Sequence, residues 1–177
     1  MNWTPHKRIA ALAGSVYLAD QFTKLVVLTF LGYAQERIVV DGFFKFVHWG
    51  NTGAAWSMFH GNNAVLAAVS AGALVLLLFN LRRFEPQQTL GWIALGLVLG
   101  GIVGNLTDRL LPSRQHVIDF IYFFVTRRDG QELGFPAFNV ADSAICVGVG
   151  LLFLQSLQSE SPNEARQKMG PPGFTQA

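Results

Sequence analysis

The chain has 177 residues, of which 51% are hydrophobic and 14% charged, and its formal net charge at pH 7 is +2. Soluble domains carry about 25% charged residues, so this composition argues against an ordinary soluble enzyme. The small net charge argues against a nucleic-acid binder, and the single cysteine, Cys146, excludes an internal disulfide framework and a CxxC motif.

Four apolar segments are long enough to cross a membrane as helices, because a hydrocarbon core of about 30 Å needs roughly 20 helical residues. The first segment is interrupted only by Asp20 and Lys24. It is longer than the apolar region of a cleaved signal peptide, which has about 7–15 residues. We therefore expect an all-α polytopic membrane protein with four transmembrane helices. The expected helices cover residues 9–31, 64–81, 89–111 and 137–157.

The two long connections between the expected helices, residues 32–63 and 112–136, contain further elements. Ile38–Val40 and Phe43–Trp49 predict two strands joined at Asp41–Gly42, because Asp-Gly is a favoured hairpin turn. In the second connection, the apolar residues of 118–125 predict a short interfacial helix or strand, and their periodicity does not distinguish the two. The expected fold thus adds a small extracytoplasmic β element and an interfacial helix or loop to the helices.

An even number of spans places both termini on one side of the membrane. Six basic residues fall on each side, but those on the terminal side are denser, with Lys7 and Arg8 beside the first span and Arg82 and Arg83 in a short turn. Because basic loops stay in the cytoplasm, both termini are expected there. Residues 1–158 are expected to form one membrane domain, and the polar, Pro- and Gly-rich tail 159–177 is expected to be disordered.

Polar residues recur inside the apolar segments at the spacing i, i+3, i+4, which places them on one helix face. Ionisable groups within membrane spans are costly and usually functional. With the expected topology, the four carboxylates Asp20, Asp108, Asp119 and Asp142 gather toward one membrane face. The sets are Asp20, Thr23 and Lys24; Asn105, Asp108 and Arg109; and Asn139, Asp142 and Ser143, while Asp119 lies in the second connection.

Asp119 and Asp142 could act together as the acids of an aspartic peptidase. Two neighbouring carboxylates in a low-dielectric site share a proton. The ionised one can take a proton from water while the protonated one donates to a carbonyl oxygen. A zinc peptidase is disfavoured because the histidines are scattered and no HExxH occurs. A Ser143–Lys24 dyad is poorly supported, and Cys146, inside an apolar helix, is expected to be packed rather than nucleophilic.

Structural roles are also open for several of these residues. Asp20 and Lys24 could neutralise each other as an i, i+4 pair, and Asp108 and Arg109 could extend from a helix end toward water. Asp119 could be an exposed loop acid or a helix cap. The overlapping GxxxG pattern of Gly96, Gly100 and Gly104 is expected to permit close helix packing.

Five segments of the chain, in order, resemble those of lipoprotein signal peptidase, also called signal peptidase II. One such segment would be weak support, but five in the family's order are highly specific. They are spread over residues 20–143, which is most of the chain outside the tail. The segments are DQFTK at 20–24, NTGAA at 51–55, GGIVGNLTDR at 100–109, VIDF at 117–120 and FNVADS at 138–143.

The resemblance implies an aspartic-type endopeptidase of the bacterial plasma (inner) membrane. Such an enzyme removes signal peptides from prolipoproteins by cleaving before a diacylglyceryl-modified cysteine. By this resemblance, Asp119 and Asp142 would be the catalytic pair on the extracytoplasmic face. Substrate binding would fall to Asn51, Gly53, Asn105, Arg109 and Asn139, with Asp20, Lys24 and Asp108 in supporting roles.

The resemblance also implies the partners of the chain. These would be diacylglyceryl-modified prolipoproteins, membrane lipid and globomycin-type inhibitors, with no metal, cofactor or nucleic acid, and the chain would be a monomer. Two other functions remain open. An ion or proton-coupled transporter would spread Asp20, Asp108 and Asp142 through the membrane depth, and a non-catalytic assembly factor would tolerate Asp→Asn at Asp119 or Asp142.

Overall fold

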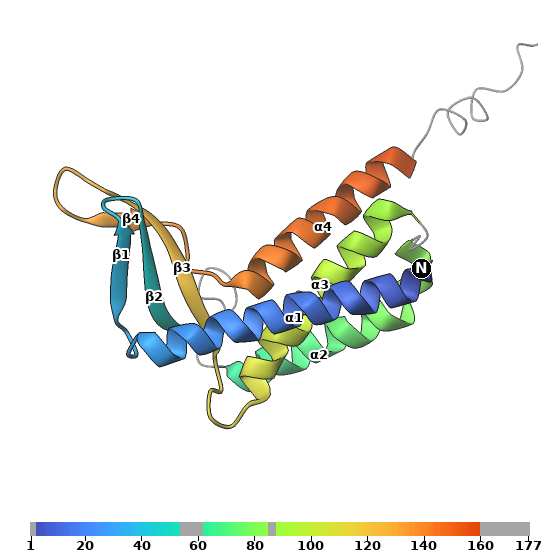
Figure 1. Cartoon of the computed structure of the whole chain (residues 1–177), viewed down its shortest axis with the longest axis horizontal. Coiled ribbons are helices and arrows are strands. Elements are labelled where there is room, and N and C mark those ends of the chain that lie inside the picture. The colour runs from blue at the N-terminus through green and yellow to red at the C-terminus, as the bar shows by residue number, and fades with distance from the viewer. Residues whose placement is uncertain (1–2, 54–61, 85–87, 160–177) are drawn as a thin grey trace, which may run out of the picture.

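The structure, a computed structural model, describes residues 3–53, 62–84 and 88–159. Over these residues the chain forms four α-helices packed lengthwise, with an antiparallel sheet at one end of the bundle (Figure 1). A short 3-10 turn, Leu81–Phe84, follows the second helix. The helices are α1 (Pro5–Phe30), α2 (Asn63–Phe79), α3 (Thr89–Leu110) and α4 (Val140–Ser159).

Three of these helices, α1, α3 and α4, are long and apolar enough to cross a membrane, whereas α2 has 17 residues. The helix boundaries follow from local chemistry where they differ from expectation. The first helix begins at Pro5, because the fixed φ of proline suits the first helical position. The last begins at Val140 rather than at residue 137, because the Asn139 side chain caps it by accepting a hydrogen bond from the backbone N–H of Asp142.

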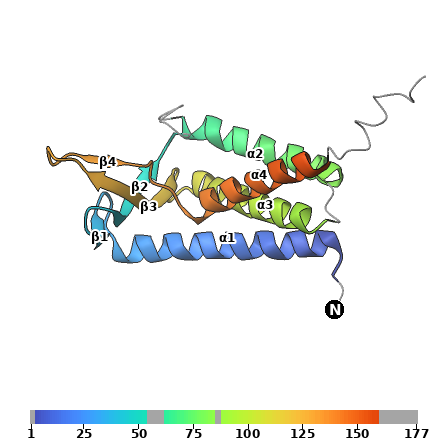
Figure 2. The ribbon, with the colours of Figure 1, turned by 90° about the horizontal axis from the view of Figure 1, so that it is seen from above.

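The sheet lies where α1 ends and α4 begins (Figure 2). The predicted hairpin is present, and Gly42 in its turn has a φ of +68°, which glycine adopts without steric cost. The apolar stretch 118–125 is a strand, because its backbone pairs with the hairpin. The expected interfacial helix or loop is therefore a strand of the sheet. The strands, in the order in which they pair, are β1 (Glu36–Val40), β2 (Phe44–Asn51), β3 (Val117–Thr126) and β4 (Glu132–Gly134).

Helix α3 lies against the three other helices and carries the glycines that allow close approach (Figure 2). A Cβ atom on Gly100 would lie 2.6 Å from the Ala13 carbonyl oxygen of α1. One on Gly101 would lie 2.5 Å from the Ala141 carbonyl oxygen of α4. The predicted close packing at the GxxxG pattern is therefore confirmed, and it brings both α1 and α4 against one short stretch of α3.

Both described ends of the chain lie at the end of the bundle away from the sheet (Figure 1). All of the predicted tail beyond Ser159 lies outside the described residues. The outer faces of the helices expose many large apolar side chains, such as Phe22 of α1 and Phe79 of α2. Exposed apolar helix faces of this kind suit contact with lipid.

Candidate active site

Asp119 lies on β3 at the junction of the sheet and the helices, and it is only 3% exposed. Two side-chain amides donate to its carboxylate. Asn51 Nδ2 of β2 lies 2.8 Å from Oδ2, and Asn139 Nδ2, just before α4, lies 2.8 Å from Oδ1. Because both oxygens are held, the orientation of the carboxyl group is fixed by Asn51 of the sheet and by Asn139 before α4.

Asp142 lies in the first turn of α4 and takes part in a capping box. Its backbone N–H donates to Asn139 Oδ1 at 2.9 Å, and its Oδ2 accepts from the Asn139 backbone N–H at 3.1 Å. Its Oδ1 accepts from Asn105 Nδ2 of α3 at 2.7 Å. The negative charge near a helix N-terminus is favoured by the helix dipole.

Asn139 joins the two carboxylates. It is fully buried and contacts Asp119 through Nδ2 and Asp142 through its backbone N–H and Oδ1. It also donates to Asn105 Oδ1 at 3.2 Å and to the Ile118 carbonyl oxygen at 3.3 Å. One residue therefore places the two acids, which come from a strand and a helix, side by side.

The environment of Asp119 changes its ionisation. Its pKa is raised from an ordinary value of 3.8 to about 7, chiefly because burial disfavours the charged form and also because the Asp142 carboxylate lies nearby. Hydrogen bonds from Asn51 and Asn139 act in the opposite direction. A carboxyl group with this pKa can hold or release a proton near neutral pH, which general acid–base chemistry requires.

A buried ionic cluster of Asp20, Lys24 and Asp108 contacts the residues that hold the two acids. Lys24 Nζ lies 2.8 Å from Asp20 Oδ2, 2.6 Å from Asp108 Oδ2 and 3.0 Å from Asn105 Oδ1, and all three charged side chains are fully buried. By donating to Asn105 Oδ1, Lys24 turns the amide so that its Nδ2 faces Asp142. Lys24 thus acts on the site through Asn105.

Asp20 connects this cluster to α4. Its Oδ1 accepts a hydrogen bond of 3.0 Å from the backbone N–H of Ala141, one of the donors left unsatisfied at a helix N-terminus. Its other oxygen faces Lys24, as an i, i+4 pair should. Asp20 therefore fixes where α4 starts relative to α1, and with it the position of Asp142.

Two residues of this cluster were not predicted, Gln21 and Arg114. Arg114 donates to Gln21 Oε1 at 2.9 Å and forms an ion pair with Asp108. Gln21 Nε2 in turn donates to Asp20 Oδ2 at 3.1 Å. Gln21 lies inside the DQFTK segment, which was a usable signal. Arg114 lies in the irregular connection after α3, where no periodicity indicates a partner.

The remaining predicted residues lie around the pair. The backbone N–H of Gly53 donates to Asn51 Oδ1 at 2.9 Å, which leaves the Asn51 amide nitrogen facing Asp119. Arg109 lies close enough to Asp119 and Asp142 to interact electrostatically, and its Nε is buried with no hydrogen-bond partner within the described part of the chain. Ala54 and Ala55 of the NTGAA segment lie outside the described residues.

The alternative chemistries gain little support. Ser143 Oγ donates to the Asn139 carbonyl oxygen at 2.9 Å, and Lys24 is held by carboxylates, so they form no Ser–Lys dyad. The expectation that Cys146 is packed is wrong, because its side chain is exposed on α4. In the described ranges, no three His, Cys, Asp or Glu side chains converge as a metal site would require.

Comparison with known proteins gives one family. The model of the family described as signal peptidase (SPase) II matches residues 12–158. A lipoprotein signal peptidase of Symbiobacterium thermophilum is 40% identical over 154 residues, covering 87% of this chain and 97% of the relative. The one of Bacillus subtilis is 34% identical over 152 residues, covering 86% and 94%.

Solved structures are also similar to this chain. A bacterial membrane enzyme determined by the in meso method at 2.3 Å resolution aligns with a TM-score of 0.73 at 26% sequence identity. The alignment covers 95% of this chain and 94% of that one. A second bacterial membrane enzyme, determined at 1.9 Å resolution, has a TM-score of 0.70 at 27% identity.

Proposed function

This chain belongs to the signal peptidase II family, and we propose that Asp119 and Asp142 are the catalytic pair with which it works. It is a membrane protein and an aspartic-type endopeptidase, which removes signal peptides from prolipoproteins by cleaving before the diacylglyceryl-modified cysteine. The observation that carries the assignment of the pair is that both carboxylates bind Asn139.

The two acids divide the work of hydrolysis. The ionised carboxylate takes a proton from a water molecule, whose oxygen bonds to the carbonyl carbon of the scissile peptide, while the protonated acid donates to the carbonyl oxygen. The resulting tetrahedral diol collapses when one acid protonates the amide nitrogen and the other takes back a hydroxyl proton. The C–N bond then breaks, releasing the signal peptide acid and the amine of the lipid-modified cysteine.

We assign the neighbouring residues by their contacts. Asn51 and Asn139 hold Asp119, and Asn105 with Asn139 holds Asp142. Arg109, whose Nε has no hydrogen-bond partner among the residues that the structure describes, is suited to bind a backbone carbonyl of the substrate. Gly53 orients Asn51 through its backbone N–H. The supporting residues Asp20, Lys24 and Asp108 form the ionic cluster behind the pair.

We further propose that all four helices cross the bacterial plasma (inner) membrane, with both termini and the tail in the cytoplasm. The sheet and the acids then lie at the extracytoplasmic face. Exposed aromatic side chains of the hairpin, including Phe43 in its turn and Trp49 on β2, suit the membrane–water interface. Residues 1–158 act as a single domain and the chain as a monomer.

The direct test is cleavage of a synthetic prolipoprotein peptide by the purified chain in detergent. We expect the diacylglyceryl-modified peptide to be cut before the modified cysteine, as read by mass spectrometry, and a globomycin-type peptide to block the reaction. The same peptide without the lipid is the control and should remain intact. Cleavage at another bond, or equal cleavage of both peptides, would contradict the proposed specificity.

The pH dependence follows from the raised pKa of Asp119. This carboxyl is protonated below pH of about 7 and ionised above it, and once both acids are ionised neither can donate a proton. We expect kcat/KM for the lipid-modified peptide to fall as pH rises through about 7. Asp41→Asn, at an exposed turn, should leave the profile unchanged. A rate that stays constant between about pH 6 and 9 would argue against proton donation by this pair.

A further inference from the structure

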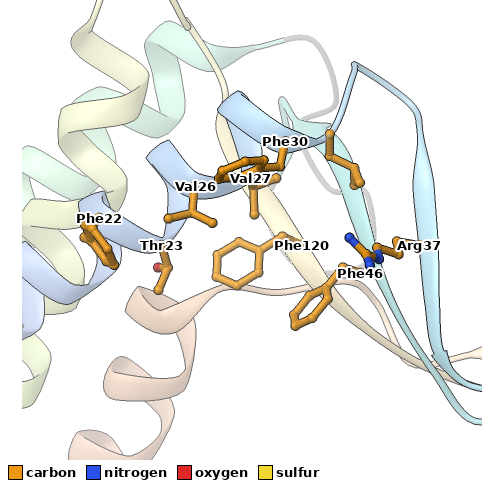
Figure 3. Close-up of a pocket in the computed structure, with 9 residues that line it drawn as sticks. Phe22, Thr23, Val26, Val27, Phe30, Arg37, Phe46 and Phe120 are labelled. Carbon is orange, nitrogen blue, oxygen red and sulfur yellow. The ribbon is translucent and has the colours of Figure 1, made fainter.

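A pocket of about 380 Å³ lies between the C-terminal half of α1 and the sheet (Figure 3). The helix contributes Phe22, Val26 and Phe30, and the sheet contributes Phe46 and Phe120. Its wall is almost entirely apolar, and its size is that of a small-molecule site. Two of its lining residues, Phe22 and Phe30 of α1, are 66% and 78% exposed.

This pocket is separate from the active site. Asp119 and Phe120 are consecutive residues of β3, so their side chains point to opposite faces of the sheet. Phe120 lines the pocket, whereas Asp119 faces Asn51 and Asn139. The strand that carries a proposed catalytic acid therefore forms the wall of the pocket with its other face.

Arg37 of β1 is the one charged residue among those that line the pocket. It is the strand partner of Phe46, and Figure 3 shows its guanidinium directed toward the pocket. Within the described residues it has no salt bridge. The adjacent Glu36 is bound instead to Lys45 at 2.7 Å. The pocket thus combines an apolar wall with one arginine that forms no salt bridge to any residue of 3–53, 62–84 or 88–159.

We propose that this pocket holds a phospholipid of the bilayer, with one acyl chain against α1 and Phe120 and the phosphate on Arg37. The proposal rests on the membrane placement proposed above, which puts the sheet at the membrane surface and α1 among lipid tails. Arginine binds phosphate through parallel charge-assisted hydrogen bonds, and none of the lining residues is acidic. The bound lipid would pack on Phe120 and steady the strand that carries Asp119.

The test is native mass spectrometry of the full chain released from detergent after exposure to phosphatidylglycerol or to diacylglycerol with the same acyl chains. We expect phosphatidylglycerol to remain bound and diacylglycerol, which lacks the phosphate, to be lost. Arg37→Gln should weaken phosphatidylglycerol binding at least about tenfold, the effect of losing a charge-assisted hydrogen bond. Arg127→Gln, at an exposed arginine outside the pocket, is the matched control and should bind as the parent chain does.

Two further arms separate the possible outcomes. Val26→Trp should fill the pocket and abolish binding, whereas Asp142→Asn should keep it, so that lipid binding is measured independently of catalysis. Equal binding by the Arg37→Gln and Arg127→Gln variants would overturn the proposal. Displacement of phosphatidylglycerol by the diacylglyceryl-modified peptide would also overturn it, because the pocket would then belong to the acyl chains of the substrate.

Discussion

Asparagine in place of either Asp119 or Asp142 is expected to abolish cleavage of the diacylglyceryl-modified peptide. An amide neither accepts the proton of water nor donates one as a carboxylic acid does. Removing one member of a catalytic unit usually costs about as much as removing the unit, and we expect kcat to fall at least about 10⁴-fold. The measurement is the initial rate of peptide cleavage, with product identified by mass.

These two variants should remain folded. An asparagine has the size of an aspartate, and its Oδ1 can still accept the hydrogen bond from Asn105 at residue 142 or from Asn139 at residue 119. Helical content by circular dichroism should be unchanged. Asp129→Asn, in the exposed turn between β3 and β4, is the matched control and should keep full activity. Substantial activity in either site variant would refute the two-aspartate mechanism and favour a non-catalytic role for the acids.

The largest loss of stability is expected from Lys24→Met. Lys24 is fully buried and is paired with Asp20 and Asp108, which are fully buried as well. Removing one partner of a buried ion pair leaves uncompensated charge and costs about 3–5 kcal/mol. Arg114 still pairs with Asp108, but Asp20 loses its cation. The free energy of unfolding can be measured by denaturant titration in mixed micelles.

Lys45→Met provides the comparison, because Lys45 is also buried and also pairs with two carboxylates. Its partners, Glu36 and Glu132, are 48% and 39% exposed, so water can solvate them when the lysine is removed. We expect a loss of about 1 kcal/mol or less there. Adding Asp20→Asn to Lys24→Met should recover part of the stability, since it removes the stranded charge. Equal losses for the two lysine variants would show that the cluster at Lys24 is not the main electrostatic support.

The bundle was largely predictable from the sequence. The four apolar segments are long enough, and contain few enough charges, to form helices that cross a membrane. The observed α2 and α3 begin and end within two residues of the expected bounds. The GxxxG spacing correctly indicated close contact of α3 with its neighbours. The Asp-Gly pair correctly predicted the hairpin, because few dipeptides suit so tight a turn.

The conformation of 118–125 could not be predicted in the same way. A short apolar run has no period that separates a strand from a helix. Its backbone groups are satisfied by pairing with β2, a segment about 75 residues earlier in the chain. The exposure of Cys146 has the same origin, because an apolar helix can turn any face toward lipid, and contacts with α3 decide which face is buried.

By itself, the sequence determined the helices and the helix faces on which Asp20, Asp108 and Asp142 lie, since these depend on spacing along one element. Asp119 and Asp142 became candidates for a different reason, the chemistry of paired carboxylates and the resemblance of five segments to one family. Only the tertiary structure decided how the acids are held. Asn139 binds both of them, Asp20 caps a helix that begins 120 residues later, and Arg114 joins the cluster from an irregular loop. The spacing of residues along a helix or strand determines which side chains share a face. Which faces of different elements meet depends on how the elements pack.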